Sequence, residues 1–348
     1  MIKNLLFSIL SWVIAFNLII FFRNYGQPGE LHWPNMIIGA NTAAIVVAII
    51  FSLVDTYHDK LRVKRKTFLQ VIVVKSLVFI LAVFIAIVVA VFTIEFYSGN
   101  FSFSGITDSL SHAFTSPDTL VYILYALVIS FIFYFYKQLS KNISQDLLTN
   151  ILLSKYIQPK EEARIFMFLD LTSATAIAEK LGAFNYSSFL QDFFYDLDTV
   201  MQETLGTPFQ FVGDEVVMVW RMEEGVKDNN CIRFFFLAEK KINEKKEKYL
   251  EKFGVVPEFK AGIHCGKIVI NEVGGSKKEI VYHGDTINTA ARIRAECNGI
   301  NKKLLISAEL LSQLTQLDGS YEIETEGVFS LKGKKNVVGL ISLKEKSQ

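Results

Sequence analysis

Apolar residues form four long runs in the first part of the chain, whereas the remainder mixes apolar and polar positions over short stretches. A helix that crosses a bilayer needs about 17 to 25 apolar residues. Four runs have this length, namely 5–22, 37–54, 71–94 and 120–136. The pattern therefore predicts a membrane domain over residues 1–136 that contains four transmembrane helices.

Basic residues flank these runs unevenly. They gather between the second and third runs and after the fourth, at Lys60, Arg62, Lys64, Arg65, Lys66, Lys137 and Lys141. The two other loops hold only Arg23. Loops rich in Lys and Arg stay in the cytosol, so we expect a multi-pass protein of the cell membrane with both termini and its C-terminal part in the cytosol. Charges inside spans usually mark conduction pathways, but the single one here, Lys75, lies within two turns of the inner surface, where its ammonium reaches the interface. The sequence also shows no inverted repeat. An anchor or sensor in the lipid bilayer is therefore favoured over a channel or transporter, which stays the alternative.

Charge separates the two parts of the chain. The 348 residues are 51% hydrophobic and 20% charged, with 36 basic and 35 acidic residues. Only eight basic and six acidic residues lie within 1–136. Residues 161–348 therefore have the composition of a soluble domain that buries its own core. The net charge of +1 gives no support for nucleic acid as a partner.

Three cysteines, Cys231, Cys265 and Cys297, all lie in the soluble part. An odd number without a CxxC pair argues against a disulfide framework or a zinc site. Unpaired thiols suit a reducing compartment.

Between the two parts, residues 137–160 form a linker in which apolar positions recur at helical spacing until Pro159. The pattern predicts that the fourth span continues as an amphipathic helix. Two interpretations stay open, a helix that packs on its own domain and a two-stranded coiled coil.

The soluble part alternates strands and helices. We expect helices over 173–181, 186–205, 225–253, 285–297 and 308–314, and strands over 164–171, 207–212, 215–220, 258–264, 267–272, 279–282, 304–306 and within 321–343. The strands 258–264 and 267–272 are expected to hinge at Cys265–Gly266, and the Lys-rich stretch 240–248 to be a solvated face. The order β-α-β-β-α-β predicts an α+β sandwich with its helices on one face of the sheet.

Two acidic residues stand out within this pattern. Asp170 ends an otherwise apolar strand, and Asp214 lies in a tight turn between two apolar strands. In a sheet of this order, these positions lie side by side, and two carboxylates there repel each other unless they share a cation. Mg²⁺ prefers oxygen ligands and is often completed by substrate phosphates. Taken singly, Asp170 is better explained as a helix N-cap and Asp214 as a turn former.

A second cluster completes a chemical set. Asn288 and Arg292 are four residues apart on one helix face, and Lys332 stands next to a glycine that lets the backbone approach a ligand. Carboxylates for a metal, a guanidinium for phosphate charge and a lysine for a polyphosphate suit nucleotidyl transfer. The neighbouring Arg294 is interpreted as a surface ion-pair residue.

Four segments then resemble a known family: FLDLTSATAIAEKLG, FQFVGDEVVMVW, VYHGDTINTAARI and GVFSLKGKK. In this order and spacing they are similar to the class III nucleotidyl (adenylate or guanylate) cyclase catalytic domain of membrane-anchored bacterial type, over residues 160–345. The resemblance implies a ferredoxin-like fold and a head-to-tail homodimer with its active sites at the subunit interface.

The resemblance also implies roles for single residues. Asp170 and Asp214 would bind two divalent metal ions, Mg²⁺ or Mn²⁺, while Asn288 and Arg292 would orient the ribose and stabilise the reacting phosphate. Lys332 would bind the triphosphate. One subunit would supply the aspartates and the other subunit the remaining three residues.

The base-reading positions depart from the family pattern. The family typically pairs Lys with Asp or Thr for adenine and Glu with Cys for guanine, whereas the matching positions here are Gln210 and Val281. A glutamine amide both donates and accepts hydrogen bonds, so it excludes no base. We expect an adenylate cyclase that converts ATP to 3′,5′-cyclic AMP and pyrophosphate in intracellular signal transduction.

Three alternatives remain: a cyclase for GTP or a pyrimidine nucleotide, a non-catalytic nucleotide-sensing membrane receptor, and a diguanylate cyclase. The turn typical of diguanylate cyclases is absent at 212–216.

Overall fold

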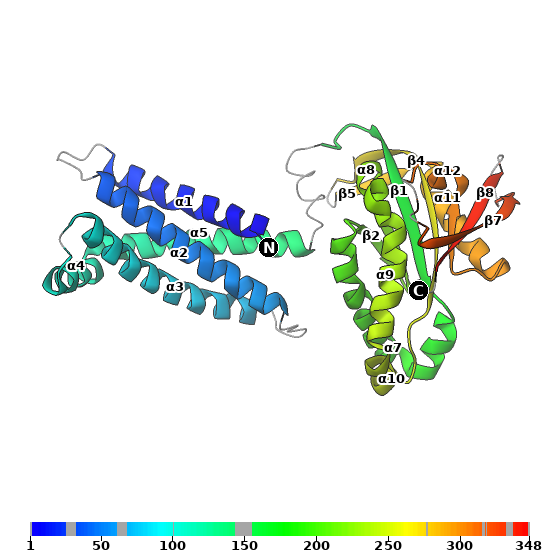
Figure 1. Cartoon of the computed structure of the whole chain (residues 1–348), viewed down its shortest axis with the longest axis horizontal. Helices are drawn as coiled ribbons and strands as arrows, with labels where there is room; N and C mark the ends of the chain where they lie inside the picture. Colours follow the sequence, from blue (N-terminus) through cyan, green and yellow to red (C-terminus); the bar gives the residue numbers. More distant parts are fainter. Residues whose placement is uncertain are drawn as a thin grey trace. The chain divides into compact units, whose positions relative to one another are not determined.

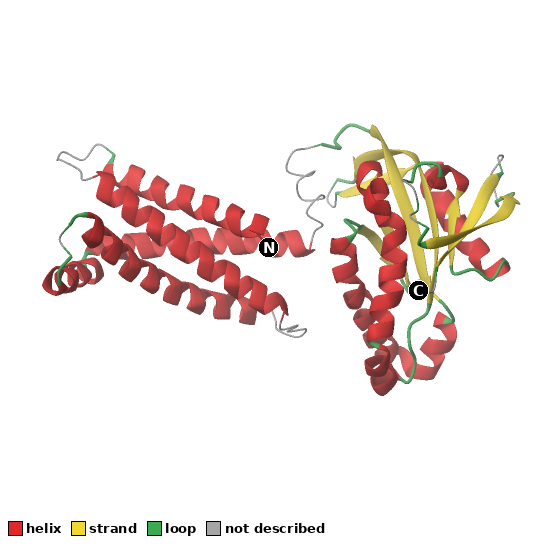
Figure 2. Ribbon diagram, viewed as in Figure 1, coloured by secondary structure: helices red, strands yellow, loops and turns green. Residues whose placement is uncertain are grey.

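The computed structural model describes residues 2–25, 33–60, 68–99, 101–142, 155–275, 278–314, 317, 319–331 and 337–346. The chain divides into two compact units, Met1–Asn142 and Ile143–Gln348. Figure 1 names the elements and Figure 2 separates them by type, with helices in the described part of the N-terminal unit and a sheet with helices in the C-terminal unit.

The described N-terminal unit consists of helices α1 (Ile2–Asn24), α2 (Trp33–Lys60), α3 (Phe68–Tyr97), α4 (Phe103–Thr115) and α5 (Pro117–Asn142). Within the described residues, three helices are long and apolar enough to cross a membrane. The number rises to four if α4 and α5, which are bent by 65° at their junction, form one span. The fourth expected span thus lies in α5.

Helix α4 was not predicted, because the sequence pattern indicated a loop between the third and fourth spans. Ser102 starts the helix, since its side chain accepts a hydrogen bond from the backbone N–H of Gly105 at 3.1 Å. With 13 residues the helix is too short to span a bilayer by itself.

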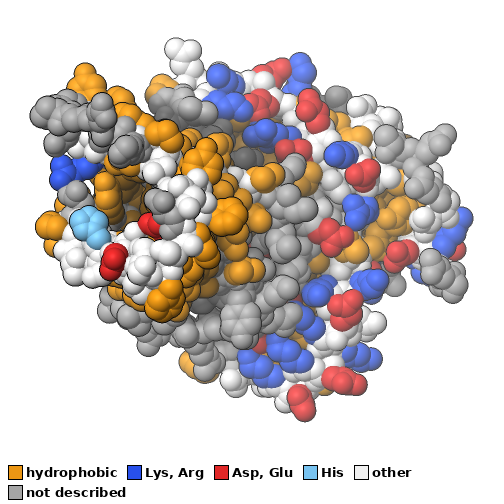
Figure 3. Space-filling view, turned by 60° about the vertical axis from the view of Figure 1, so that its left-hand side comes forward, with side chains coloured by type: hydrophobic (Ala, Val, Ile, Leu, Met, Phe, Trp, Pro, Cys, Tyr) orange, Lys and Arg blue, Asp and Glu red, His pale blue; other side chains and the backbone are white. Residues whose placement is uncertain are grey.

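An aromatic cluster joins α1, α2, α3 and α5 of this unit. Trp12 is buried and contacts the rings of Phe16, Phe51, Phe79 and Phe133, which come from α1, α2, α3 and α5. On the outside, Figure 3 shows hydrophobic side chains gathered over this unit, whereas charged side chains are spread over the C-terminal unit. Apolar residues on both the inside and the outside are what a helix bundle in lipid requires.

The described residues include only part of the predicted linker. Helix α5 continues to Asn142, as the predicted extension of the fourth span requires. Residues 143–154 lie outside the described residues, and residues 155–158 form turns rather than a helix.

The C-terminal unit is built on one sheet with the strand order β2-β3-β1-β4-β6-β8-β7, and β5 pairs with β4. The strands are β1 (Lys160–Leu171), β2 (Thr207–Val212), β3 (Glu215–Arg221), β4 (Phe259–Val273), β5 (Glu279–His283), β6 (Leu304–Ser307), β7 (Tyr321–Phe329) and β8 (Val338–Glu345). All described pairs are antiparallel except β4 with β6. This confirms the α+β class.

Helices cover both faces of the sheet. Helices α7 (Ala174–Glu203), α9 (Asn230–Glu244) and α10 (Lys246–Phe253) pack on the face that carries Ile165 and Met167. Helix α11 (Asp285–Gly299) packs on the opposite face, where Ala290 joins Phe166 and Ile268. The prediction of helices on one face was therefore wrong. Strand β1 is apolar at successive positions, so both of its faces need cover.

The local prediction of a hinge at Cys265–Gly266 also needs correction. Strand β4 is continuous over 15 residues, so Cys265–Gly266 is not a hinge. Gly266 instead allows a close approach, because a Cβ there would lie 2.7 Å from Oγ1 of Thr286. The break expected at Gly182 is confirmed, because Gly182 is non-helical at φ 71° and forms the kink between the two helical segments that are joined under the label α7. The remaining short elements are α8 (Met222–Val226), the 3₁₀ helix η1 (Lys227–Asn229) and α12 (Ala308–Leu311).

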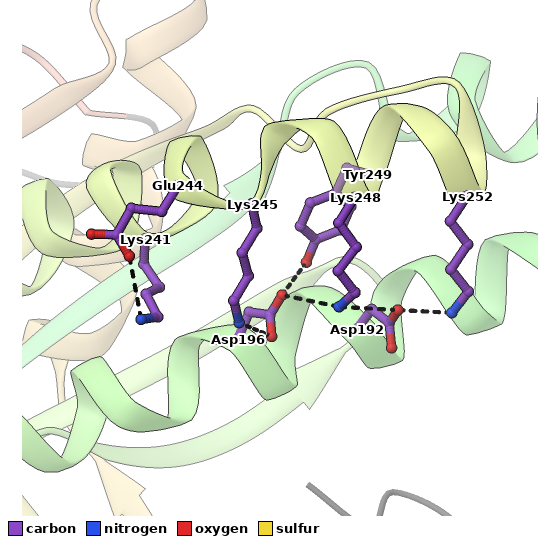
Figure 4. A network of polar contacts seen from close by, with 8 residues as sticks. All are labelled: Asp192, Asp196, Lys241, Glu244, Lys245, Lys248, Tyr249 and Lys252. Carbon is purple, nitrogen blue, oxygen red and sulfur yellow. Dashed lines mark hydrogen bonds and ion pairs between the residues drawn. The ribbon is translucent and has the colours of Figure 1, made fainter. Parts of the chain in front are cut away.

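The Lys-rich stretch is not simply a solvated face. Figure 4 shows lysines of α10 and its junction with α9 directed at two acidic residues of α7. Lys245 pairs with Asp196, and Nζ of Lys252 lies 2.8 Å from Oδ2 of Asp192. Both aspartates are buried, at 1% and 4% exposure. The lysines therefore neutralise charges that the helix packing has removed from water.

Candidate functional site

The two aspartates lie at the same end of the sheet, where β1 ends and β2 turns into β3. The register pairs Asp170 with Glu215, and Asp214 is the residue just before it in the β2–β3 turn. Gly213 makes this turn possible because its φ is +61°, a conformation that glycine adopts without steric cost. The sheet thus brings together the two residues that the sequence pattern paired.

Negative charge is concentrated here. Burial, as the larger cause, and the charge of the neighbouring Asp214 both raise the pKa of Glu215. Burial and Asp214 also raise the pKa of Tyr186, which lies on α7. A site that opposes further negative charge is one that a cation stabilises.

The donor set suits a hard cation with further ligands from elsewhere. Asp170 and Asp214 offer carboxylate oxygens, the donors that Mg²⁺ prefers. Among the described residues, no group of three or more His, Cys, Asp or Glu side chains could hold a metal ion. Two carboxylates alone leave most positions of an octahedral ion to water or to substrate phosphates.

A cation of the chain already lies beside Asp170. Arg294 of α11 forms an ion pair with Asp170, and both side chains are largely buried, at 20% and 15% exposure. Gly262 of β4 allows this, since a Cβ there would lie 2.1 Å from the backbone nitrogen of Arg294. The interpretation of Arg294 as a surface ion-pair residue missed its partner. A glycine inside an apolar strand was the available signal, because it marks a close backbone approach.

Asn288 and Arg292 lie on the part of α11 that does not pack on the sheet. The packed side carries Ala290, Ile293 and Cys297, which are all fully buried, whereas Asn288 is exposed and the Arg292 side chain is 30% exposed. Arg292 lies 3.9 Å from Asp285 and, within the part of the chain that the structure describes, its Nη1 has no hydrogen-bond partner.

The structure therefore does not join Arg292 to Asp170 within the described chain; Asp170 pairs with Arg294 instead. Lys332 lies outside the described residues. The residue before it, Leu331, is buried in the apolar cluster that contains Ile293 and Cys297 of α11.

The base-reading candidates lie on β2 and β5. Gln210 is exposed and pairs with Val217, and Val281 is half-buried and pairs with Asn271. The residues next to them bring the two strands together, because the rings of Phe209 and Tyr282 meet at 4.7 Å between centroids.

His264 is packed rather than placed for chemistry, as its position in an apolar strand predicts. It is buried, and its Nδ1 lies 2.8 Å from Oγ of Ser307 on β6.

Comparison with known proteins identifies the C-terminal unit. Residues 156–342 match the family described as the adenylate and guanylate cyclase catalytic domain. Adenylate cyclase 2 of Rhizobium meliloti (strain 1021) is 31% identical over 221 residues, which cover 64% of this chain and 61% of that protein. Receptor-type guanylate cyclase gcy-14 of Caenorhabditis elegans is 25% identical over 206 residues, or 57% of this chain and 18% of that protein. The chain thus spans less than two thirds of either relative.

A solved structure shows the same fold. A bacterial light-regulated adenylyl cyclase superposes with a TM-score of 0.52 at 18% identity, over 64% of this chain and 65% of that chain. Because the family match covers more than half of the chain, the protein belongs to the adenylate and guanylate cyclase family and carries a class III nucleotidyl cyclase catalytic domain.

Proposed function

We propose that the protein is a membrane-anchored adenylate cyclase that converts ATP to 3′,5′-cyclic AMP and pyrophosphate. The observation that carries the proposal is the β1–β3 register, which sets Asp170 beside the turn that holds Asp214. The choice of ATP is supported by the relative named adenylate cyclase 2. Gln210 and Val281 match neither usual base-reading pair, so GTP and pyrimidine nucleotides are tested as alternatives.

In the reaction, the ribose 3′-oxygen attacks the α-phosphorus, the bond from this phosphorus to the pyrophosphate oxygen breaks, and the 3′-hydroxyl proton passes to solvent. Divalent cations held by Asp170 and Asp214 would lower the pKa of the 3′-hydroxyl and neutralise phosphate charge. Asn288 orients the ribose, and the guanidinium of Arg292, whose buried Nη1 makes no hydrogen bond within the described residues, offers one to the phosphate charge that builds up in the transition state. Lys332 binds the triphosphate.

We further propose that each site is shared between two copies of the chain. Arg292 and Asn288 lie on the unpacked side of α11, and the cation that Asp170 contacts in its own chain is a different one, Arg294. In a homodimer, one subunit would supply Asp170 and Asp214, and its partner would supply Asn288, Arg292 and Lys332.

The test is product identification by mass spectrometry. The detergent-purified protein is incubated with each of the four ribonucleoside triphosphates and Mg²⁺ or Mn²⁺. We expect 3′,5′-cyclic AMP and pyrophosphate from ATP, and loss of both products in Asp170→Ala, which removes a metal ligand. Asp198→Ala changes an exposed aspartate of α7 and should retain activity.

Other outcomes have defined meanings. A cyclic product from GTP or a pyrimidine nucleotide alone would keep the enzyme class and overturn the substrate. No product from any nucleotide, in a folded protein that binds ATP, would favour the nucleotide-sensing receptor. Full activity in Asp170→Ala would mean that the site lies elsewhere.

A further inference from the structure

The ion pair between Asp170 and Arg294 has no place in the proposed reaction. Asp170 is the residue through which a metal would bind, yet its carboxylate faces a guanidinium of the same chain. Within the described residues, Nε of Arg294 is buried and has no hydrogen-bond partner. A guanidinium removed from water in this way depends on its counter-ion.

We propose that Arg294 is a built-in counter-ion that occupies Asp170 in the metal-free protein and that a divalent cation must displace to bind. The inference rests on the proposed function, because it takes Asp170 as a metal ligand. It adds that this ion pair raises the metal concentration that the protein needs. The free energy of the ion pair is lost when the metal binds, so the metal affinity is lower than two carboxylates without a counter-ion would give.

Neighbouring cations do not share this role. Lys260 is the cross-strand partner of Asp170 on β4, but its Nζ donates to Oδ1 of Asn298 at 3.0 Å. Arg292 is closest to Asp285, at 3.9 Å. Among the described residues, Arg294 is thus the cation whose removal would free the carboxylate of Asp170.

A second role for Arg294 makes the opposite prediction. A guanidinium that merely orients Asp170 for the metal would support binding, and its loss would weaken metal affinity. A guanidinium that competes with the metal lowers affinity, and its loss would strengthen binding. The sign of the change therefore decides between a competing and a positioning residue.

The experiment measures Mn²⁺ binding without nucleotide, by electron paramagnetic resonance of free Mn²⁺, on the full chain in detergent. Charge-assisted hydrogen bonds contribute about 1.5–3 kcal/mol, or roughly 10- to 100-fold in affinity. We expect Arg294→Gln to bind Mn²⁺ about tenfold more tightly than the natural chain. Arg294→Lys keeps the positive charge and should bind Mn²⁺ about as weakly as the natural chain does.

Arg233→Gln is the matched control, because Arg233 forms an exposed ion pair with Glu203 at 3.3 Å, away from the site. It should leave Mn²⁺ affinity unchanged. Unchanged or weaker binding in a folded Arg294→Gln would overturn the inference. If Arg294→Gln does not fold, the natural chain supplies the test. Saturating Mn²⁺ should then speed amide exchange in the second half of α11, and unaltered exchange would overturn the inference.

Asp170→Asn separates this inference from the proposed function. If Asp170→Asn binds Mn²⁺ as well as the natural chain does, the metal site is misplaced and both proposals fail. If Asp170→Asn loses binding while Arg294→Gln changes nothing, the metal site stands and the counter-ion role alone is wrong.

Discussion

Burial sets the chemistry of the three cysteines. Desolvation, with a smaller effect from Cys265, raises the pKa of Cys231 to about 12. Desolvation also raises the pKa of Cys297 to about 12 and that of Cys265 to about 11. Because the thiolate is the reactive form, these shifts from an ordinary value near 9 reduce the reactive fraction at pH 8 by about 10²- to 10³-fold.

We therefore predict that iodoacetamide leaves all three cysteines of the folded protein unmodified at pH 8 and labels all three in denaturant. Mass spectrometry of the peptides measures the labelling of each cysteine in the folded and in the denatured protein. The sign of the shifts also predicts a pH dependence, because the folded state favours neutral thiols. Their contribution to the free energy of unfolding is fully present below about pH 9 and is lost as the pH rises toward 12. Rapid labelling of Cys265 in the folded protein at pH 8 would contradict the burial argument.

At the scale of elements, the contact of α7 with α9 and α10 depends on buried charge. Asp196 is 1% exposed, pairs with Lys245, and accepts a hydrogen bond from Oη of Tyr249 at 3.0 Å (Figure 4). Burial and then Asp196 raise the pKa of Tyr249, so the phenol stays protonated as the donor. Removing one partner of such a network leaves the others desolvated and unpaired.

Asp196→Ala should therefore weaken local stability by about 3–5 kcal/mol. The measurement is amide exchange of α9 and α10 in the full chain, which should become much faster. Glu244→Ala is the control, because Glu244 forms an exposed ion pair with Lys241 at 3.3 Å and such pairs contribute about 0–1 kcal/mol. Equal effects of the two substitutions would mean that the aspartate contributes no more than a surface charge.

The elements also show what the sequence could predict. The apolar run 164–171 predicted β1, but the strand starts at Lys160, because Lys160–Ala163 pair with Lys267–Ile270 of β4. Polar residues joined the strand through a distant partner, which no local pattern reveals. The positions of Asp170 and Asp214 were predictable because strand order alone sets them. The contact of Arg294 with Asp170 was not, since it depends on how closely α11 lies on Gly262.

At the scale of the whole molecule, the charged ends of the helices predict how they are oriented in a membrane. The basic residues within 60–66 and those at the C-terminal end of α5, Lys137 and Lys141, predict a cytosolic side, and residues 98–118 hold no Lys or Arg. A reporter fused after Lys141 or inserted within 60–66 should be cytosolic. A reporter at Gly99, where a side chain would meet no atom within 4 Å, should lie on the far side. Cytosolic location of the Gly99 reporter would contradict the orientation.

The shared-site proposal leads to a prediction for mixed dimers. Asp170→Ala and Arg292→Ala should each be inactive, because each removes one half of every site. A heterodimer of the two variants has one site with both lesions and one with none. With random pairing, half of the dimers are heterodimers, so co-expression should restore about a quarter of the natural activity by the two-fold symmetry of such a dimer.

A complete site within each chain predicts a different result. Every site would then carry one lesion whatever its partner, and no mixing ratio would restore cyclic-nucleotide formation. The comparison requires that both variants fold and that heterodimers form. Co-purification of differently tagged copies establishes that heterodimers form. Confirmed heterodimers without activity would exclude the shared site. Recovery near a quarter would identify the surface around Asn288 and Arg292 as the one that meets the Asp170 end of the partner's sheet.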